Sequence, residues 1–457
     1  MPVEHGTRST IFSSGSNDAG DPAVAESAQR KASWRLLPVI AVGYGLAYMD
    51  RVNISFASLR MNDDLHFSAT VYGIGAGLFF IGYAFCEVPS NLLMLHFGPR
   101  RWLARIMLTW GLLAAAMMFV RTPWQFYALR LLLGIAEAGF FPGVVYYLTL
   151  WFPASMRARA VSRFYISLPL SSTVMGSIAG WLMGLGGKLG LAGWQWLFLV
   201  EGLPAALFSV VIFRMLPDSP ADARWLTAEE QASLQQQLDA DSVKAHLGHG
   251  AGVLRALVSP QVWLIGSYFF CALFCSYAFN FSAPAILQIA TGWSIAQVGY
   301  LVASLGVAGA AAMIANAEHS DRSGERAFHC IIPCLVMGAA FLVAGSWHEA
   351  WVVILALGTS FVAFVSMLGP GVSVPTQFLA GRAAAAGIAA MNTITMFSGF
   401  AGPVWMGWVK DHTGSYDLGL RSLIIPSFAA AGLMYTLTRN LARSQPQQAA
   451  ALAKEPA

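Results

Sequence analysis

Long apolar segments alternate with short polar connections along almost the whole chain. Each segment is mostly Leu, Val, Ile, Ala, Phe and Gly without strict period-two alternation, so the pattern predicts helices. About 20 apolar residues in a helix cross the roughly 30 Å hydrocarbon core of a bilayer. The sequence therefore predicts an all-α membrane protein with twelve transmembrane helices, near residues 36–56, 73–95, 102–120, 124–150, 161–185, 194–215, 260–287, 294–315, 328–346, 350–372, 384–408 and 418–438.

The composition agrees with a membrane protein. Hydrophobic residues make up 56% of the 457 residues and charged residues 11%, whereas an ordinary soluble domain is about 25% charged. This excludes a soluble enzyme, a disordered regulator and a fibrous protein. The net charge of +4 gives no indication of a nucleic-acid partner, and the five cysteines, an odd number in apolar segments, argue against a disulfide framework.

The distribution of Lys and Arg predicts the orientation. With a cytoplasmic N-terminus, twenty of the 27 basic residues fall in cytoplasmic segments, five fall outside, and Arg51 and Arg130 lie within spans. Cytoplasmic connections carry such an excess of Lys and Arg. The sequence therefore predicts twelve spans with both termini in the cytoplasm.

The spans fall into two groups of six. A long polar connection between them contains Thr227 and Glu230 at capping-box spacing, ahead of a Gln-rich amphipathic helix. Two comparable halves with a site between them are typical of transporters. The predicted organisation is a disordered cytoplasmic tail over 1–33, an N-terminal six-helix bundle over 34–215, a cytoplasmic linker over 216–259, a C-terminal six-helix bundle over 260–440 and a disordered cytoplasmic tail over 441–457.

Six ionisable side chains lie at membrane depth, where they are costly and usually functional. They are Asp50, Arg51, Glu87, Arg130, Glu137 and Glu201. One interpretation is that they only pair off and tie helices together; the other is that the two buried cations bind an anionic substrate. Glu87 and Glu201 are interpreted as structural, through hydrogen bonds across helix interfaces.

Depth distinguishes the two acids near the arginines. From a rise of 1.5 Å per residue, Asp50, Arg51 and Arg130 share an outer polar layer, and Glu137 lies about 10 Å deeper than Arg130. We therefore expect Asp50 to stay ionised and to hold Arg51 or relay protons to it, and Glu137 to carry the coupling proton.

Several motifs resemble the anion:cation symporter family of the major facilitator superfamily, over about residues 34–440. The first-span motif begins at Tyr48 and includes Asp50, Arg51 and Asn53. The other similar segments are Glu87–Asn91, Gly98–Trp102, Arg130–Pro142, Trp194–Phe198, Ser320–Arg322 and Gly387–Asn392.

The resemblance implies the major facilitator fold and proton-coupled uptake of organic anions by alternating access. It implies that Asp50 and Glu137 handle protons. It also implies substrate-binding residues, which are Tyr48, Arg51, Tyr83, Arg130, Tyr277 and Asn392. Relatives in this family carry tartrate, sugar acids, phthalate and hydroxyphenylacetate.

The expected partners are a small organic acid, a proton and membrane lipid. We expect a monomer in the bacterial inner membrane, with no cofactor, metal or nucleic acid.

Two short basic loops occupy matching places in the two halves. They contain the candidate gating residues Arg100, Arg101, Asp321, Arg322 and Arg326, whose side chains can bond the ends of neighbouring helices. The alternative is ordinary positive-inside charge.

Other classes of function fit less well. A channel would need a continuous polar stripe or charged ring, and a membrane enzyme a reactive constellation; neither is evident in the sequence. Within transport, an uncoupled organic-anion facilitator or exchanger is the alternative to a proton-coupled carrier.

Overall fold

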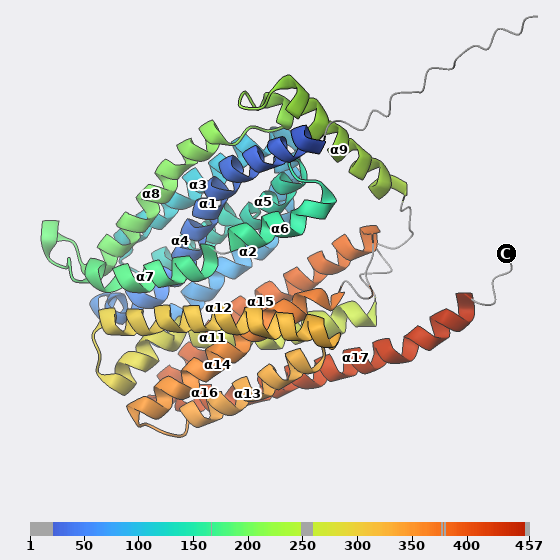
Figure 1. Ribbon diagram of the computed structural model, residues 1–457. Coiled ribbons are helices and arrows are strands. Elements are labelled where there is room, and N and C mark those ends of the chain that lie inside the picture. The colour runs from blue at the N-terminus through green and yellow to red at the C-terminus, as the bar shows by residue number, and fades with distance from the viewer. Residues whose placement is uncertain (1–21, 166, 248–258, 376–377, 379–380, 453–457) are drawn as a thin grey trace, which may run out of the picture.

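The computed structural model describes residues 22–165, 167–247, 259–375, 378 and 381–452, and these ranges contain helices but no strand (Figure 1). The first half consists of α1 (Pro22–Leu65), α2 (Ala69–Phe97), α3 (Pro99–Ala116), α4 (Pro123–Glu137), α5 (Phe140–Thr149), α6 (Ala154–Tyr165), α7 (Ser167–Met183) and α8 (Gly193–Met215). Helix α9 (Ala228–Leu247) follows. The second half consists of α11 (Pro260–Thr291), α12 (Ile295–Ser323), α13 (Phe328–Ala344), α14 (Ala350–Ser373), α15 (Gly381–Thr413), α16 (Asp417–Ser422) and α17 (Ile424–Leu452).

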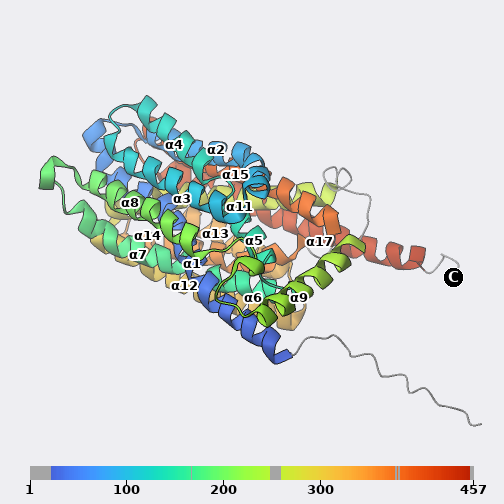
Figure 2. The ribbon, with the colours of Figure 1, turned by 90° about the horizontal axis from the view of Figure 1, so that it is seen from above.

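Each half has its own apolar core. One cluster of buried residues joins α1–α9 and reaches Phe281 of α11, and a second joins α11–α17. Figure 1 shows the two helical groups lying side by side, and Figures 1 and 2 both show α9 at one end of the molecule. Within the described ranges, eight segments are long and apolar enough to cross a bilayer, and large apolar side chains such as Trp124 and Leu207 are exposed, as expected of a surface that faces lipid.

The two halves meet closely at one end of the molecule. We call this the distal end; it carries the α1–α2, α7–α8 and α11–α12 connections and lies opposite α9 (Figure 1). Gly176 of α7 faces Gly299 of α12, and Gly73 of α2 faces Pro403 of α15, so closely that a Cβ on any of these glycines would overlap the opposing backbone. Small residues allow such close helix contact in membranes.

Hydrogen bonds between the halves also lie at the distal end. The Asp411 carboxylate, near the end of α15, accepts the Ala69 N–H at 2.9 Å and the Thr70 N–H at 2.8 Å. The Tyr72 hydroxyl on α2 donates to the Phe281 carbonyl on α11 at 2.9 Å. Asp411 therefore caps the first turn of α2 from the other half.

The predicted disordered N-terminal tail is wrong for residues 22–33, which form the first turns of α1. Ala28 and Ala32 are fully buried in this segment, and Lys31 pairs with Glu230 of α9 at 2.7 Å. The composition of the segment is polar, but alanines spaced four apart give it one apolar face that packs.

The predicted capping box is confirmed, because Thr227 and Glu230 exchange hydrogen bonds at the start of α9.

Two further expectations need correction. Helix α17 continues to Leu452, so the C-terminal tail predicted to be disordered is helical as far as the structure describes it. The predicted continuous span over 124–150 is broken between α4 and α5, because Gly139 has a φ of +87° that interrupts the helix.

Candidate functional site

An ion pair between α1 and α4 lies at the boundary between the halves. Arg51 donates to Glu137 Oε1 from Nη2 at 2.6 Å and from Nε at 2.8 Å. Glu137 is fully buried and is the last residue of α4, whereas 23% of the Arg51 side chain is exposed. Tyr277, from α11 of the other half, lies close enough to interact electrostatically with Arg51. A partly exposed cation at this boundary can bind an anion.

The expected contact between Asp50 and Arg51 is wrong. Successive residues on a helix point about 100° apart, so these two side chains leave α1 in different directions. Arg51 points to Glu137, whereas Asp50 is 4% exposed and lies beside Trp110 of α3.

The partly exposed Arg51 and the buried Arg130 share one aromatic ring. The guanidinium carbons of Arg51 and Arg130 lie 5.6 Å and 5.0 Å from the centre of the Phe79 ring, distances typical of cation–π contacts. Arg130 also donates to the carbonyls of Gly75 at 3.3 Å and Ala76 at 3.4 Å. In the described part of the chain no carboxylate lies within 4 Å of Arg130, which is 1% exposed, so no direct ion pair neutralises its charge.

Asp50 belongs to a second polar group, inside the first half. The Asn53 amide donates to Asp50 Oδ1 at 3.3 Å and to Glu201 Oε2 of α8 at 2.5 Å. Among the residues that the structure describes, the other oxygens of these acids, Asp50 Oδ2 and Glu201 Oε1, have no hydrogen-bond partner. Glu201 was interpreted as structural from the sequence; the structure places it in one network with a predicted proton-handling residue.

The remaining predicted substrate residues are distributed around Arg51. The Tyr83 ring centre lies 5.1 Å from the Arg51 guanidinium. Tyr277 packs on Phe80 with ring centres 4.6 Å apart, and Tyr48 lies near Tyr277. Asn392 is partly buried on α15, and among the described residues no hydrogen bond joins it to this group. Arg51, Tyr48, Tyr83 and Tyr277 therefore come together, whereas Asn392 is not joined to them.

Each predicted gating loop is held within its own half. The Arg100 backbone N–H donates to Asp218 at 2.8 Å, and the Arg100 side chain to the Phe213 carbonyl at 2.5 Å. Arg101 is exposed. In the second half, Arg326 pairs with Asp321 at 3.4 Å, and Arg322 pairs with Glu318 at 3.2 Å.

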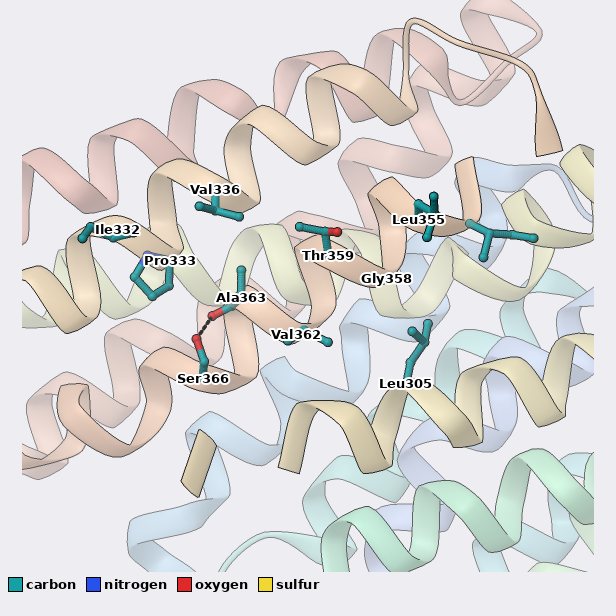
Figure 3. Close-up of a pocket in the computed structure, with 11 residues that line it drawn as sticks. Leu305, Ile332, Pro333, Val336, Leu355, Gly358, Thr359, Val362, Ala363 and Ser366 are labelled. Carbon is teal, nitrogen blue, oxygen red and sulfur yellow. Dashed lines mark hydrogen bonds between the residues drawn. The ribbon is translucent and has the colours of Figure 1, made fainter. Parts of the chain in front are cut away.

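A cavity of the second half lies away from these residues. It has a volume of about 460 Å³ and is open on one side, among α12, α13 and α14 (Figure 3). Its lining is apolar apart from Thr359 and Ser366, and the Ser366 hydroxyl is already bonded to the Ala363 carbonyl at 2.8 Å. No charged side chain lines it, so this cavity does not suit an organic anion.

Sequence reasoning missed the part that four residues take in these contacts, which are Phe79, Asn53, Asp411 and Glu201. Phe79 resembles any apolar residue of a span, and Asn53 is an ordinary polar residue until its two acidic partners are known. Asp411 lies beyond the predicted end of its span, where exposed acids are common. Glu201 alone had a usable signal, a carboxylate at membrane depth with no base nearby in the sequence.

The chain was compared with known proteins. A family model described as Major Facilitator Superfamily matches residues 40–403. A protein of Agrobacterium vitis named "Putative tartrate transporter" is 43% identical over 92% of each chain. The "Putative metabolite transport protein NicT" of Pseudomonas putida is 40% identical over 85% of this chain and 90% of its own length.

A solved structure supports the fold. A bacterial homologue of the human lysosomal transporter Spinster superposes with a TM-score of 0.72 at 16% identity, covering 88% of this chain and 96% of its own. The expected fold, two six-helix halves of the major facilitator type, is confirmed, and so is the expectation that the protein is not an enzyme. The chain belongs to the Major Facilitator Superfamily and is a multi-pass membrane transporter of organic substrates.

Proposed function

We propose that the protein is a proton-coupled symporter that brings a small organic anion across the bacterial inner membrane by alternating access. The observation that carries this proposal is the Arg51–Glu137 ion pair at the boundary between the halves. The names of the relatives, which include tartrate carriers, support a carboxylate as substrate. We propose a monomer as the working unit, because the site is built from both halves of one chain, with Arg51 and Glu137 from the first half and Tyr277 from the second.

The ion pair suggests how anion and proton are coupled. A substrate carboxylate competes with Glu137 for the Arg51 guanidinium, while Arg130 supplies a second positive charge nearby. Once Glu137 loses its cation, the buried carboxylate is costly to keep ionised, so it takes up a proton. Anion and proton then favour each other's binding by the same factor.

The distal contacts support an inward-facing conformation. With both termini and α9 in the cytoplasm, the distal end faces outward, and there the halves are joined by Asp411 and by the contacts of Gly176 and Gly299. Opening to the outside requires these contacts to break. We propose that the loops of Arg100 and Arg322, each now bonded within its own half, make contacts between the halves in the opposite conformation.

Transport in reconstituted vesicles tests the proposal, with tartrate first in a panel of carboxylic acids. Glu137→Gln mimics the protonated acid, so it should exchange substrate across the membrane but lose accumulation driven by a pH gradient. Glu87→Gln is the matched control, because Glu87 is an acid of α2 outside the Arg51 ion pair. Gradient-driven accumulation in Glu137→Gln would contradict the role of Glu137. Absence of proton movement with substrate in the wild type would favour the uncoupled facilitator or exchanger.

A further inference from the structure

The buried polar residues around Arg51 and Asp50, here called the polar cluster, include more acids than cations. Asp50, Glu137 and Glu201 are each at least 94% buried, and two arginines, Arg51 and Arg130, lie among them. Arg51 neutralises Glu137 directly. The remaining two acids face one arginine that contacts neither of them, so the fully ionised cluster would carry an excess negative charge in a buried place.

Of the three acids, Glu201 is the one whose negative charge is least balanced by nearby positive charge. Its Oε2 accepts the Asn53 amide, its Oε1 has no partner, and in the described ranges no Lys, Arg or His nitrogen lies within 4 Å of it. Asp50 differs, because both arginines act on it electrostatically. An isolated buried carboxylate is far more costly than a neutral acid.

The helices around Glu201 supply no missing cation. Helix α7 has no charged residue, and on α1 the charged groups at this level are Asp50 and Arg51, of which Arg51 is occupied by Glu137. On α3, Gly111 lies against Gly202, the residue after Glu201. The nearest arginine of α3, Arg105, is six residues before Gly111, or about 9 Å along the helix.

We propose that Glu201 is a proton-binding residue of the transport site and holds a resident proton while the site is empty. Asn53 links it to Asp50, since one amide group donates to both acids, so the two acids titrate as a coupled pair. This goes beyond the roles of Asp50 and Glu137 and rests on the proposed function. Its consequence is that the two arginines then face only two charged acids, so the cluster is neutral and an anion that displaces Glu137 from Arg51 meets no excess negative charge.

Infrared spectroscopy of the purified, substrate-free protein tests the proton directly. The wild type at neutral pH should show the carbonyl band of a protonated carboxylic acid that Glu201→Gln loses and Asp50→Asn retains. Glu201→Asp keeps an acid at the position and should give a shifted band, which guards against a variant that fails to fold. An unchanged band in Glu201→Gln, or loss of the same band in Asp50→Asn, would overturn the assignment.

The pH dependence of substrate binding separates this inference from the proposed function. Calorimetry would measure the affinity of the protein for tartrate, or for the best substrate of the panel, at several pH values across the alkaline range. The wild-type affinity should fall as pH rises. In Glu201→Gln the slope of log Kd against pH should be smaller by up to one, which corresponds to one proton fewer taken up when substrate binds. Equal, non-zero slopes would reject the role of Glu201. A wild-type affinity that does not depend on pH would instead reject the coupling of anion and proton.

Discussion

Asp411 offers a direct test of the conformational cycle. Its two carboxylate oxygens accept the Ala69 and Thr70 N–H groups at the start of α2, at 2.9 Å and 2.8 Å, although the residues belong to opposite halves. The change Asp411→Asn keeps the shape of the side chain but removes its charge. It also places an amide NH₂ opposite one of the two N–H donors, so one of the two hydrogen bonds is lost.

The size of the effect follows from the geometry. Replacing a side chain that caps a helix costs about 1 kcal/mol, and the interaction of a carboxylate with the helix dipole is worth about 0.3–1 kcal/mol at exposed sites. Asp411 is exposed, so we take about 1 kcal/mol for the whole change. Since 1.4 kcal/mol is a factor of ten, the ratio of molecules closed to molecules open at the distal end should fall about fivefold.

Spin labels at Arg121 and His348 can measure this ratio. Both are exposed at the distal end, one in each half, in the α3–α4 and α13–α14 connections. Asp64→Asn is the matched control, because Asp64 is an exposed acid at the same end whose bond to Trp194, at 2.9 Å, stays within the first half. Equal distance distributions in Asp411→Asn and the wild type would refute the reasoning, and so would an equal shift in Asp64→Asn.

Acid should not release this contact under ordinary conditions. Burial raises the pKa of Asp411, but hydrogen bonds from Thr70, Ser68 and Ala69 outweigh it and hold the pKa below its ordinary value of 3.8. A lowered pKa means that the stabilisation is fully present above pH 3.8 and is lost only as the pH falls through the lowered value. The distal contact should therefore not sense protons near neutral pH.

Three other outcomes follow from the structure. Arg51→Lys or Arg130→Lys should greatly reduce uptake although charge is kept, because Lys cannot present a planar fork to a carboxylate; unchanged substrate affinity would contradict this. Gly176→Leu should prevent closure at the distal end and abolish uptake while leaving substrate binding from outside, measured in right-side-out vesicles. Glu230→Gln should loosen α1 from α9 by no more than about 1 kcal/mol, seen as faster proteolysis near Lys31. Hydrogen bonds from Lys31 lower the pKa of Glu230 to about 2, so in the wild type this contact should persist above pH 4.5 and weaken as pH falls toward 2.

The sequence was sufficient for the fold because the bilayer imposes strong rules. Spans must be long and apolar, and basic residues gather on one side, so both patterns are visible without a structure. The tail was misjudged because its burial depends on a partner about 200 residues away. Ala28 and Ala32 are buried in a core cluster that also contains Leu234 of α9. The break at Gly139 was invisible because an apolar segment gives no indication of backbone conformation.

The sequence predicted which residues belong to the candidate site better than it predicted which of them contact each other. Depth along the helix placed Asp50 and Arg51 together, but depth ignores the direction in which each side chain leaves the axis. The partners on other helices, Glu137 of α4 for Arg51 and Glu201 of α8 for Asn53, are set by the rotation of α1 against α4 and α8. That rotation depends on packing between helices distant in sequence.

The different directions in which Arg51 and Asp50 leave α1 also affect how anion and proton binding are coupled. Arg51 and Glu137 lie toward the boundary between the halves, whereas Asp50, Asn53 and Glu201 lie inside the first half, on another face of α1. A change of charge at Asp50 therefore cannot act on substrate by releasing Arg51, because it does not hold Arg51. It can act through the field at Arg130, or by moving α1 against α8. Since Asp50 is bonded through Asn53 to Glu201, removing its charge should shift the carbonyl band of the protonated Glu201 before it alters the ion pair of Arg51.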